Sequence, residues 1–494
     1  MFQPHVRDRS SAEAVASDLE RQPHLFMRLA ENALVVAENL RHNYFRNTAA
    51  FVSHLRRAMA RDQPIFQTHF VGDTRWLDLQ GEVVTFIDGG VGQVQLSNRT
   101  PILLRVGSYS VRTGERSLSE RETFGYYPII LGDLEGGTRT RKDFIDIVRI
   151  TAELLGGLSA LEQMPHLDVL MFHGPLVNLL DLYAGHSPFT ESDIDLFLNQ
   201  YGHHPQSARL LKEEFLIEAR RSIYPRLTAD ARIWSDRRLF EPLSWISFLY
   251  RRLLHIAKAR SPKPLIIGVV EQEEMRQFSE HIVLPRVFRG LADKRNHDYF
   301  ITMYGRTDLT SASALLDRLG YSDALLLALL LDPGHYSEPW QIDKTQAQTT
   351  GSIRLPGDNR QSRVDWQALH PPSPVGFPAV TGCYVHVSEM TEPIRIEVFS
   401  DLADEQIEPA ARRAYLYARL LPGYGFPVGL EIADKYAHVP TWLTSAYGKL
   451  IRYHLSVSLQ MGEISDAQMQ RLMVQAMYVT NRDWLFRPKS TRAE

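Results

Sequence analysis

The chain has 494 residues, of which 44% are hydrophobic and 23% are charged, and its formal net charge is −3. This length suggests two or three domains, or one large domain with insertions, and the near-neutral charge means that any contact with DNA must come from local patches. The single cysteine, Cys383, excludes a disulfide framework and a cysteine-based zinc site, and it predicts a cytoplasmic protein.

The chain is predicted to begin with a helical region, residues 1–65. Met1–Ser11 is polar, so no signal peptide is expected. From Ser11 to about Arg61, leucines recur at roughly helical spacing with charges between them. The second half of this stretch is basic, which indicates either a solvated helix face or a face that binds phosphates.

Residues 66–177 are predicted to form the first part of an α/β core. Its key stretch is the β-rich run Val83–Ile87, which is followed by Asp88, Gly89 and Gly90. A short apolar run bounded by turn residues predicts a buried strand, and an acid just past such a strand stands where α/β sheets place their chemistry. The alternative is an ordinary Asp-Gly turn between two strands.

Three further strands and a helix are predicted to follow. The strands span 93–96, 102–106 and 108–112, and they form an antiparallel meander with the strand before Asp88. The helix spans about 140–158, and three acids lie on or near it: Asp143, Asp146 and Glu153.

A second strand and turn are predicted at Leu167–Leu176. Its apolar run ends at His173 and Gly174, as the first run ends at Asp88 and Gly89. Asp168 and His173 are an odd number of positions apart, so they face opposite sides of a continuous strand. Asp168 is therefore not expected to join His173 in a site.

The rest of the chain is predicted to contain a helical insertion, 178–262, and the second part of the core, 263–455. The latter includes a mobile loop at 341–378, and a helical tail follows at 456–494. The longest apolar run, Ala324–Leu331, is too short to span a bilayer and predicts a buried helix, so no membrane association is expected. The remaining predicted elements are helices at 190–198, 207–220, 242–259, 408–420 and 428–437 and strands at 264–271, 382–387 and 394–399.

The possible chemistry is narrowed by the motifs that are missing. The sequence has no phosphate-binding loop of the type Gly-x4-Gly-Lys-Ser/Thr and no Gly-x-Ser-x-Gly elbow, and Cys383 within a strand is a poor nucleophile. What remains are acids and histidines at strand ends and helix starts. A divalent-metal phosphodiesterase is assembled in this way, because carboxylates hold Mg²⁺ or Mn²⁺ and the metal activates water.

The order of the motifs resembles that of the NurA nucleases over about residues 80–450. The segments that carry the resemblance are Ile87–Gly90, the helix around Asp146, Phe172–Leu176, Gly268–Glu271, and Gly423–Pro427 with Ala433–Lys435. Asp332–Ser337 and Arg395–Glu397 also look like the family's pattern.

This resemblance implies an α/β fold with an RNase H-like mixed sheet flanked by helices, to which the helical N-terminal region and the helical insertion are added. It also implies a homodimer that cleaves DNA with Mn²⁺ or Mg²⁺. The implied partner is a HerA-type hexameric translocase, in DNA end processing and repair or in defence against foreign DNA. The implied metal-binding and catalytic residues are Asp88, Asp146, His173 and Asp434.

The departures from the family pattern matter as much as the matches. The family's second strand-end aspartate is His173 here, its C-terminal histidine is Asp434, and its strand-end lysine is Glu271. The family's helix glutamate has no clean counterpart; Asp146 is the best match, and Asp143 and Glu153 are rivals. Only Asp88 is retained without change.

Two hypotheses follow, and a protein unrelated to nucleases is a third possibility. In the first hypothesis His173 and Asp434 have exchanged roles around one metal, which keeps one imidazole and one carboxylate. In the second the site has decayed, and the protein binds DNA and docks the translocase without cutting. Glu271 favours decay, because it replaces a candidate phosphate contact with a negative charge.

Three other residues are weaker candidates. His438 shares a helix face with Asp434 and could replace the lost histidine, but it lies about 6 Å further along the helix axis. Tyr336 and Tyr384 are candidates for the family's functional tyrosine, and the alternative for each is a half-buried ring without a role in the site.

Overall fold

The computed structural model describes residues 23–60, 64–94, 100–117, 122–134, 138–178, 191–200, 205–223, 242–271, 275–286, 322–342, 352–353, 364–365, 377–421, 423–462 and 464–478. The chain packs as two compact units, one made of Met1–Gln67 and Glu274–Leu330, the other of Thr68–Glu273 and Leu331–Glu494. This division groups part of the predicted second core segment, 263–455, with the N-terminal helices. The domain boundaries expected from the sequence remain predictions.

The first unit is helical in its described residues. Asp323 is fully buried, and its carboxylate accepts hydrogen bonds from the backbone N–H groups of Phe278 and Ser279 at 2.9 and 2.8 Å. Arg56 Nε donates to the carbonyl oxygen of Leu329 at 2.8 Å, which ties the N-terminal helices to the buried apolar helix. The helices are α2 (Pro23–Asn39), the π-helix η1 (Leu40–Phe45), α3 (Arg46–Met59), the π-helix η5 (Ser279–Val283) and α12 (Asp323–Leu330).

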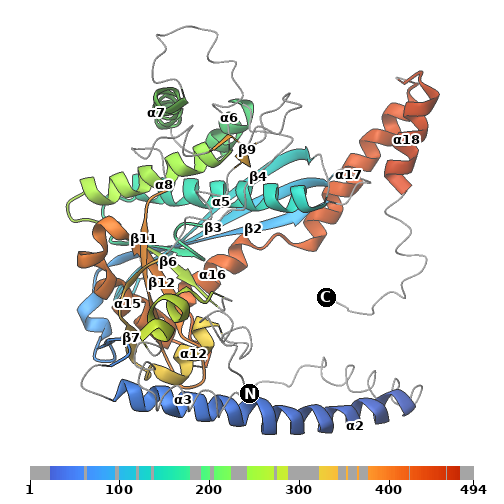
Figure 1. Cartoon of the computed structure of the whole chain (residues 1–494). Coiled ribbons are helices and arrows are strands. Elements are labelled where there is room, and N and C mark those ends of the chain that lie inside the picture. The colour runs from blue at the N-terminus through green and yellow to red at the C-terminus, as the bar shows by residue number, and fades with distance from the viewer. Residues whose placement is uncertain are drawn as a thin grey trace. The chain divides into compact units, whose positions relative to one another are not determined.

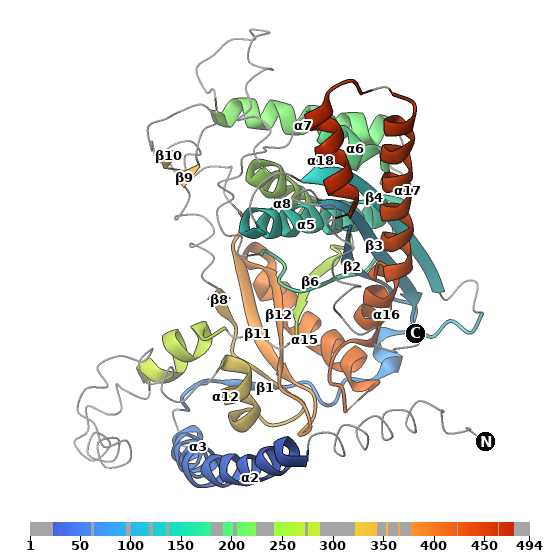
Figure 2. The same ribbon diagram turned by 90° about the vertical axis from the view of Figure 1, so that its right-hand side faces the viewer.

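The second unit is built on one mixed ten-stranded sheet. The sheet is twisted, so that β2–β4 and β11–β12 run in different directions in Figures 1 and 2. In sheet order the strands are β1 (Thr68–Phe70), β7 (His335–Ser337), β11 (Val380–His386), β12 (Ile394–Phe399), β6 (Leu265–Val270), β5 (Val169–His173), β2 (Val83–Gln93), β3 (Thr100–Arg112) and β4 (Glu122–Leu134), and β8 (Trp340–Ile342) pairs with β11.

The centre of this sheet is parallel. β5 pairs in parallel with β2 on one side and with β6 on the other, whereas β2, β3 and β4 form an antiparallel meander. Within the first pair Ile87 lies opposite Phe172, so the next residues, Asp88 and His173, stand side by side. The meander and the parallel strands beside it confirm the predicted RNase H-like mixed sheet flanked by helices.

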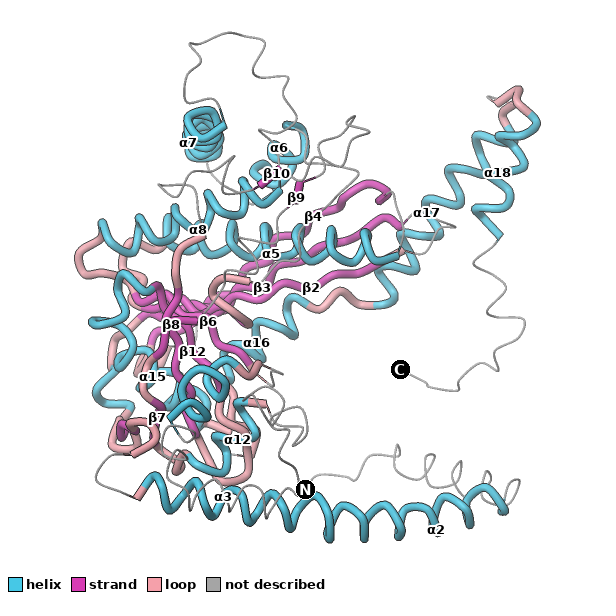
Figure 3. The backbone as a smooth tube through the Cα atoms, viewed as in Figure 1, coloured by secondary structure: helices cyan, strands magenta, loops and turns pink. Residues whose placement is uncertain are grey.

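Helices cover both faces of the sheet, as Figures 1 and 3 show. On one face α5 packs against β2, β3 and β5, and α8 packs on α5. On the other face α15 packs against β11, β12 and β6, and α16 packs against β2, β3 and β5. The described helices of this unit are the 3₁₀ helices η2 (Trp76–Leu79) and η6 (Ser400–Leu402), and α5 (Thr138–Gln163), α6 (Glu191–Gln200), α7 (Pro205–Ile223), α8 (Pro242–Ala259), α15 (Ala403–Arg419), α16 (Val428–Ala437), α17 (Thr441–Gln460) and α18 (Ala467–Tyr478).

The main core lies between the sheet and α15 and α16. Small side chains of α15, such as Ala410, Ala411 and Ala414, are fully buried against β-branched residues of the strands, such as Ile396 and Val398. Because alanine adds little bulk, the helix backbone can approach the sheet closely. The core therefore fixes the positions of both helices on this face.

Several predicted elements differ in extent from the observed ones. The first strand does not end at Asp88 but continues through both glycines to Gln93, and the predicted strands at 102–106 and 108–112 are one strand, β3. The reason is pairing: Gly107 lies opposite Asp88 in an unbroken antiparallel register, so neither glycine-containing stretch forms a turn.

Two other predicted segments are only partly covered. Most of the predicted loop at 341–378 and the end of the predicted tail, 479–494, lie outside the described residues, apart from β8 and the short pair β9 (Ser352–Ile353) and β10 (Val364–Asp365) in the loop region. In the part of the chain that the structure describes, no helix combines the length and the apolar character needed to cross a membrane.

Candidate active site

Asp88 and His173 form the centre of the candidate site. His173 Nδ1 lies 2.9 Å from Oδ2 of Asp88, and the Gly89 N–H donates to the other carboxylate oxygen, Oδ1, at 2.7 Å. Asp88 is buried and His173 is partly buried. Burial by itself lowers the pKa of His173, but the hydrogen bond to Asp88 and the charges of Asp88, Glu153 and Asp434 raise it overall. The imidazole therefore holds a proton more readily than a free imidazole does, because it lies in a negatively charged cluster.

Helix α16 carries Asp434 to this pair because glycines remove the obstacles to its approach. A β carbon on Gly90 or Gly107 would lie only 2.1 Å and 2.3 Å from carbonyl oxygens of the helix, those of Ala437 and Ala433. On the helix itself, a β carbon on Gly429 would lie 2.3 Å from the ring of Phe86. Only with glycine at these places can α16 lie directly on β2 and β3.

Asp434 interacts with Asp88 from this position. Asp434 is partly desolvated, it feels the negative charge of Asp88, and its carboxyl shares a hydrogen bond with the Asp88 carboxyl; together these raise the pKa of Asp434, against the opposing effect of His173. Neighbouring carboxyls repel each other when both are ionised. The structure thus places the exposed Asp434 near the Asp88–His173 pair, and whether the three residues share a metal stays a prediction.

Glu153 reaches the site from the opposite face of the sheet. It lies on α5, and its Oε1 is 2.5 Å from the position that a β carbon on Gly89 would occupy. Residues 89 and 90 face opposite sides of the strand, so Glu153 and α16 are separated by β2. Burial and the charge of Asp88 raise the pKa of Glu153 to about 7, although Arg149 at 2.6 Å opposes the shift.

An acidic rim surrounds Asp434. Glu431 lies one turn before it on α16 and accepts a hydrogen bond from the hydroxyl of Tyr424 at 2.5 Å. Glu271 follows β6, and burial together with the charge of Glu431 raises its pKa. Burial, the hydrogen bond to Glu431 and the charges of Glu271 and Asp434 raise the pKa of Tyr424. Glu271 and Glu431 thus place further acidic groups close to Asp434.

The structure does not bring the other sequence candidates into contact with Asp88. Asp146 is half-buried on α5 and acts through its charge on Arg149, and the side chain of Asp143 lies outside the described residues. His438 is exposed at the end of α16, where its carbonyl accepts a hydrogen bond from Arg105 at 3.3 Å. Among the acids of α5, the geometry therefore favours Glu153 over Asp146.

The two tyrosine candidates lie in the other half of the sheet. Tyr336 on β7 is buried and stacks on His69, with 4.8 Å between ring centroids, and burial raises its pKa to about 12. Tyr384 on β11 is buried and stacks on Trp340 at 5.3 Å. At about 4.8 Å per strand, β11 and β7 lie about 14 and 19 Å from β5. Both rings fit the alternative of a packing role.

Sequence reasoning did not single out Arg149, Glu431 or Tyr424. For Arg149 and Glu431 the spacing indicated contact with a candidate acid: Arg149 lies four residues before Glu153 and Glu431 three residues before Asp434, and such pairs are neighbours on a helix. The sequence alone could not show which helix faces would meet the sheet at Asp88.

The donor set suits a divalent cation, although the side chains are not gathered around one point. Within the described residues, no three His, Cys, Asp or Glu side chains are grouped closely enough to hold a metal ion. The 2.9 Å between Asp88 and His173 is nevertheless close to the roughly 3 Å that separates adjacent ligands in an octahedral shell. The mutual repulsion that raises the pKa of Asp434 is what a bound cation would relieve.

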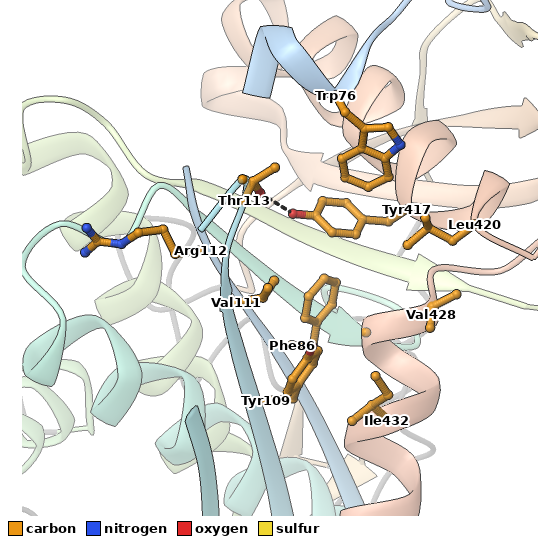
Figure 4. A pocket seen from close by; sticks show the side chains of 12 residues that line it. Trp76, Phe86, Tyr109, Val111, Arg112, Thr113, Tyr417, Leu420, Val428 and Ile432 are labelled. Carbon is orange, nitrogen blue, oxygen red and sulfur yellow. Dashed lines mark hydrogen bonds between the residues drawn. The ribbon is translucent and has the colours of Figure 1, made fainter. Parts of the chain in front are cut away.

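An apolar cavity of about 390 Å³ lies beside the amino-terminal end of α16 (Figure 4). Phe86, Tyr109 and Tyr417 line one side of it, and Val428 and Ile432 of α16 line another. The hydroxyls of Thr113 and Tyr417 form a 3.0 Å hydrogen bond at its edge. Phe86 lies two residues before Asp88 on the same face of β2, so the cavity borders the elements of the site but contains none of its acids.

Comparison with known proteins assigns the chain to a family. A family model described as the NurA domain matches residues 82–439, which is more than half of the chain. A comparison with the curated proteins finds no match.

Similar solved structures cover most of the chain at low identity. They include the NurA nuclease from Sulfolobus solfataricus (10% identity, 86% of this chain and 97% of that one, TM-score 0.44). They also include NurA with manganese (11% identity, 84% and 95%, TM-score 0.37) and NurA bound to dAMP and manganese (11% identity, 86% and 94%, TM-score 0.32).

Proposed function

The chain belongs to the NurA domain family, and from that premise we propose that it is a divalent-metal-dependent nuclease that cleaves phosphodiester bonds in DNA. The observation that carries the proposal is the contact of His173 with Asp88 at the ends of two parallel strands, with Asp434 of α16 near enough to feel the charge of Asp88. Two carboxylates and an imidazole suit Mn²⁺, which accepts nitrogen ligands more readily than Mg²⁺ does.

The arrangement supports exchanged roles for His173 and Asp434. Both side chains face Asp88, one from the end of β5 and the other from α16. Exchanging a carboxylate and an imidazole across one site leaves the number of each unchanged, and therefore the summed charge of the ligands too. Complementary changes of this kind are expected where the site is still used.

In the proposed site Asp88, His173 and Asp434 hold Mn²⁺ or Mg²⁺, and Glu153 is the helix acid in place of Asp146. The bound cation would supply Lewis acidity that lowers the pKa of a water molecule and stabilises charge on the leaving oxygen. The Gly89 N–H fixes one oxygen of Asp88, and Arg149 orients Glu153. A carboxyl with a pKa of about 7 can take up or release a proton near neutral pH, which suits Glu153 to proton transfer.

We extend the proposal to a homodimer that works with a HerA-type hexameric translocase in DNA end processing or in defence against foreign DNA. Family membership supports this extension. Co-purification of the tagged chain with such a translocase, and the mass of the chain in solution, test the two parts separately.

A second candidate is a subunit that binds DNA and docks the translocase without cutting. It is favoured by the existing pairing of the acids: Asp88 is satisfied by His173 and Gly89, and Glu153 by Arg149. These contacts give the carboxylates of Asp88 and Glu153 hydrogen-bond partners without a metal. Glu271 adds negative charge where a phosphate would approach.

Cleavage of labelled single- and double-stranded DNA in Mn²⁺, with and without a HerA-type translocase, separates the two candidates. The nuclease proposal expects cleavage that falls at least about a hundredfold in Asp88→Ala. Glu405→Gln, which alters an exposed carboxylate on α15 paired with Lys263, is the matched control and should cut normally. Cleavage that survives in Asp88→Ala contradicts the proposal, and DNA binding without any cleavage supports the second candidate.

A further inference from the structure

A buried ion pair lies behind the candidate site, on the face of the sheet that α5 and α8 cover. Arg395 and Glu397 of β12 are 1% and 0% exposed. Arg395 donates to Oε1 of Glu397 through Nη2 at 2.7 Å and through Nε at 3.1 Å. The second carboxylate oxygen, Oε2, is left to interact with another partner.

That partner is the loop that follows His173. The backbone N–H of Leu176 donates to Oε2 of Glu397 at 3.0 Å, across 221 positions of sequence. Gly268 of β6 makes this approach possible, because a β carbon there would lie 2.2 Å from the Leu176 nitrogen. The contact joins β12 to the end of β5 through the gap that Gly268 leaves.

The same loop, residues 174–178, is held at both ends as well. Gly174 adopts a φ of +104°, and its N–H donates to the carbonyl oxygen of Val269 at 2.7 Å. At the far end the backbone and side-chain N–H groups of Asn178 both donate to the hydroxyl of the buried Tyr250 at 3.2 Å. Glu397 thus supplies the middle of three anchors, and it is the only charged acceptor among these three.

Stability alone is a weak reason to bury such a pair. Desolvation of two charges offsets most of their attraction, and well-packed apolar residues of similar size commonly serve as well or better. An ionised acceptor, however, makes a stronger hydrogen bond to a backbone N–H than a neutral one does. The ion pair therefore adds a strong hydrogen bond to the backbone of Leu176, three residues after His173.

We propose that Glu397 is a positioning residue for His173: by fixing the loop at Leu176 it holds the imidazole against Asp88 in the orientation needed to bind a divalent cation. Arg395 acts one step further back, because it orients the Glu397 carboxylate. The inference rests on the proposed function for its metal, but the anchoring itself does not depend on cleavage. Residues that orient metal ligands commonly matter for affinity by about 10- to 100-fold.

Two double variants separate the effect of the hydrogen-bond acceptor at position 397 from the effect of the ion pair. Arg395→Met with Glu397→Gln removes both charges but keeps an oxygen for the Leu176 N–H. Arg395→Met with Glu397→Met removes both charges and the oxygen. Because both charges of the pair are removed together, both variants are expected to fold, and thermal unfolding and circular dichroism check this directly.

Titration of the full chain with Mn²⁺ by calorimetry is the first measurement. We expect the Met/Gln variant to bind within about threefold of wild type and the Met/Met variant at least about tenfold more weakly. Amide hydrogen exchange at Leu176 should accelerate only in the Met/Met variant. Equal Mn²⁺ affinity in two folded variants overturns the proposal.

The titration of His173, followed by NMR without metal, keeps the two proposals distinguishable. If wild type binds no Mn²⁺, the proposed function fails, and the positioning role is judged from this titration alone. A lower His173 pKa in Met/Met than in Met/Gln supports it, because the contact with Asp88 has loosened. An identical pKa in both variants overturns it.

Discussion

His173 faces Asp88 across two parallel strands, with 2.9 Å between Nδ1 and Oδ2, although 85 positions separate the two residues in the sequence. The register of β2 and β5 sets this contact, and α16 adds Asp434 to it through glycine-lined packing.

The proposed exchange of roles between His173 and Asp434 predicts a specific pattern of rescue. His173→Asp and Asp434→His should each weaken Mn²⁺ binding at least about tenfold, because the first leaves three carboxylates and no imidazole and the second leaves two imidazoles and only one carboxylate. The double variant restores one imidazole and one carboxylate in the family's order, so it should bind better than either single variant. Calorimetric titration with Mn²⁺ measures all four proteins. A double variant that is weaker than both single variants would show that the two positions do not share a metal.

Close packing of α16 predicts that Gly107→Ala is costly. The new β carbon would lie 2.3 Å from the carbonyl oxygen of Ala433, and backbone cannot rotate away as a side chain can. We expect a loss of about 1–3 kcal/mol in the free energy of unfolding, the usual cost of overpacking, with weaker Mn²⁺ binding because Asp434 is displaced. Gly423→Ala is the control, since nothing lies within 4 Å of its β carbon position. Denaturant unfolding of both variants makes the comparison, and equal stability would refute the packing argument.

The raised pKa of Glu153 predicts a stability that falls with pH in the metal-free protein. Its folded pKa is about 7 against a reference of 4.5, so the folded state binds more protons than the unfolded state between these values. The stabilisation of the protonated form is present in full below pH 4.5 and is lost as the pH rises through 7. Glu153→Gln lacks this titration.

The measurement is denaturant unfolding at pH 5 and pH 8 in the presence of a chelator. We expect Glu153→Gln to lose less stability than wild type between the two pH values. The variant also leaves Arg149 without its partner at 2.6 Å, but Arg149 stays charged at both pH values, so this cost changes little with pH. The same pH dependence in both proteins would rule out Glu153 as the titrating group.

The only cysteine of the sequence serves as a probe of the core. Cys383 on β11 is fully buried, and burial raises the pKa of its thiol well above the ordinary value. A thiol reagent should therefore react slowly with the native protein and rapidly after unfolding in guanidinium, because only the thiolate attacks. Rapid labelling of the native protein at neutral pH would show that this part of the sheet opens readily.

The sequence by itself determined much of the secondary structure and which polar residues stand near the ends of the strands. The β-rich run before Asp88, the run that ends at His173 and the helix around Asp434 are all observed, because hydrophobic period and local turn chemistry act over a few residues. The same local reasoning ended the first strand at Asp88, whereas pairing of Gly107 with Asp88 carries it on to Gln93.

Only the tertiary structure decided which of those residues meet. Choosing Glu153 over Asp146 depends on the rotation of α5 against Gly89, and placing Asp434 beside Asp88 depends on how closely α16 lies on β2 and β3. The Leu176 anchor on Glu397 likewise spans 221 positions. Such contacts are set by strand register and by helix packing between distant segments, and no pattern within a single segment encodes either of them.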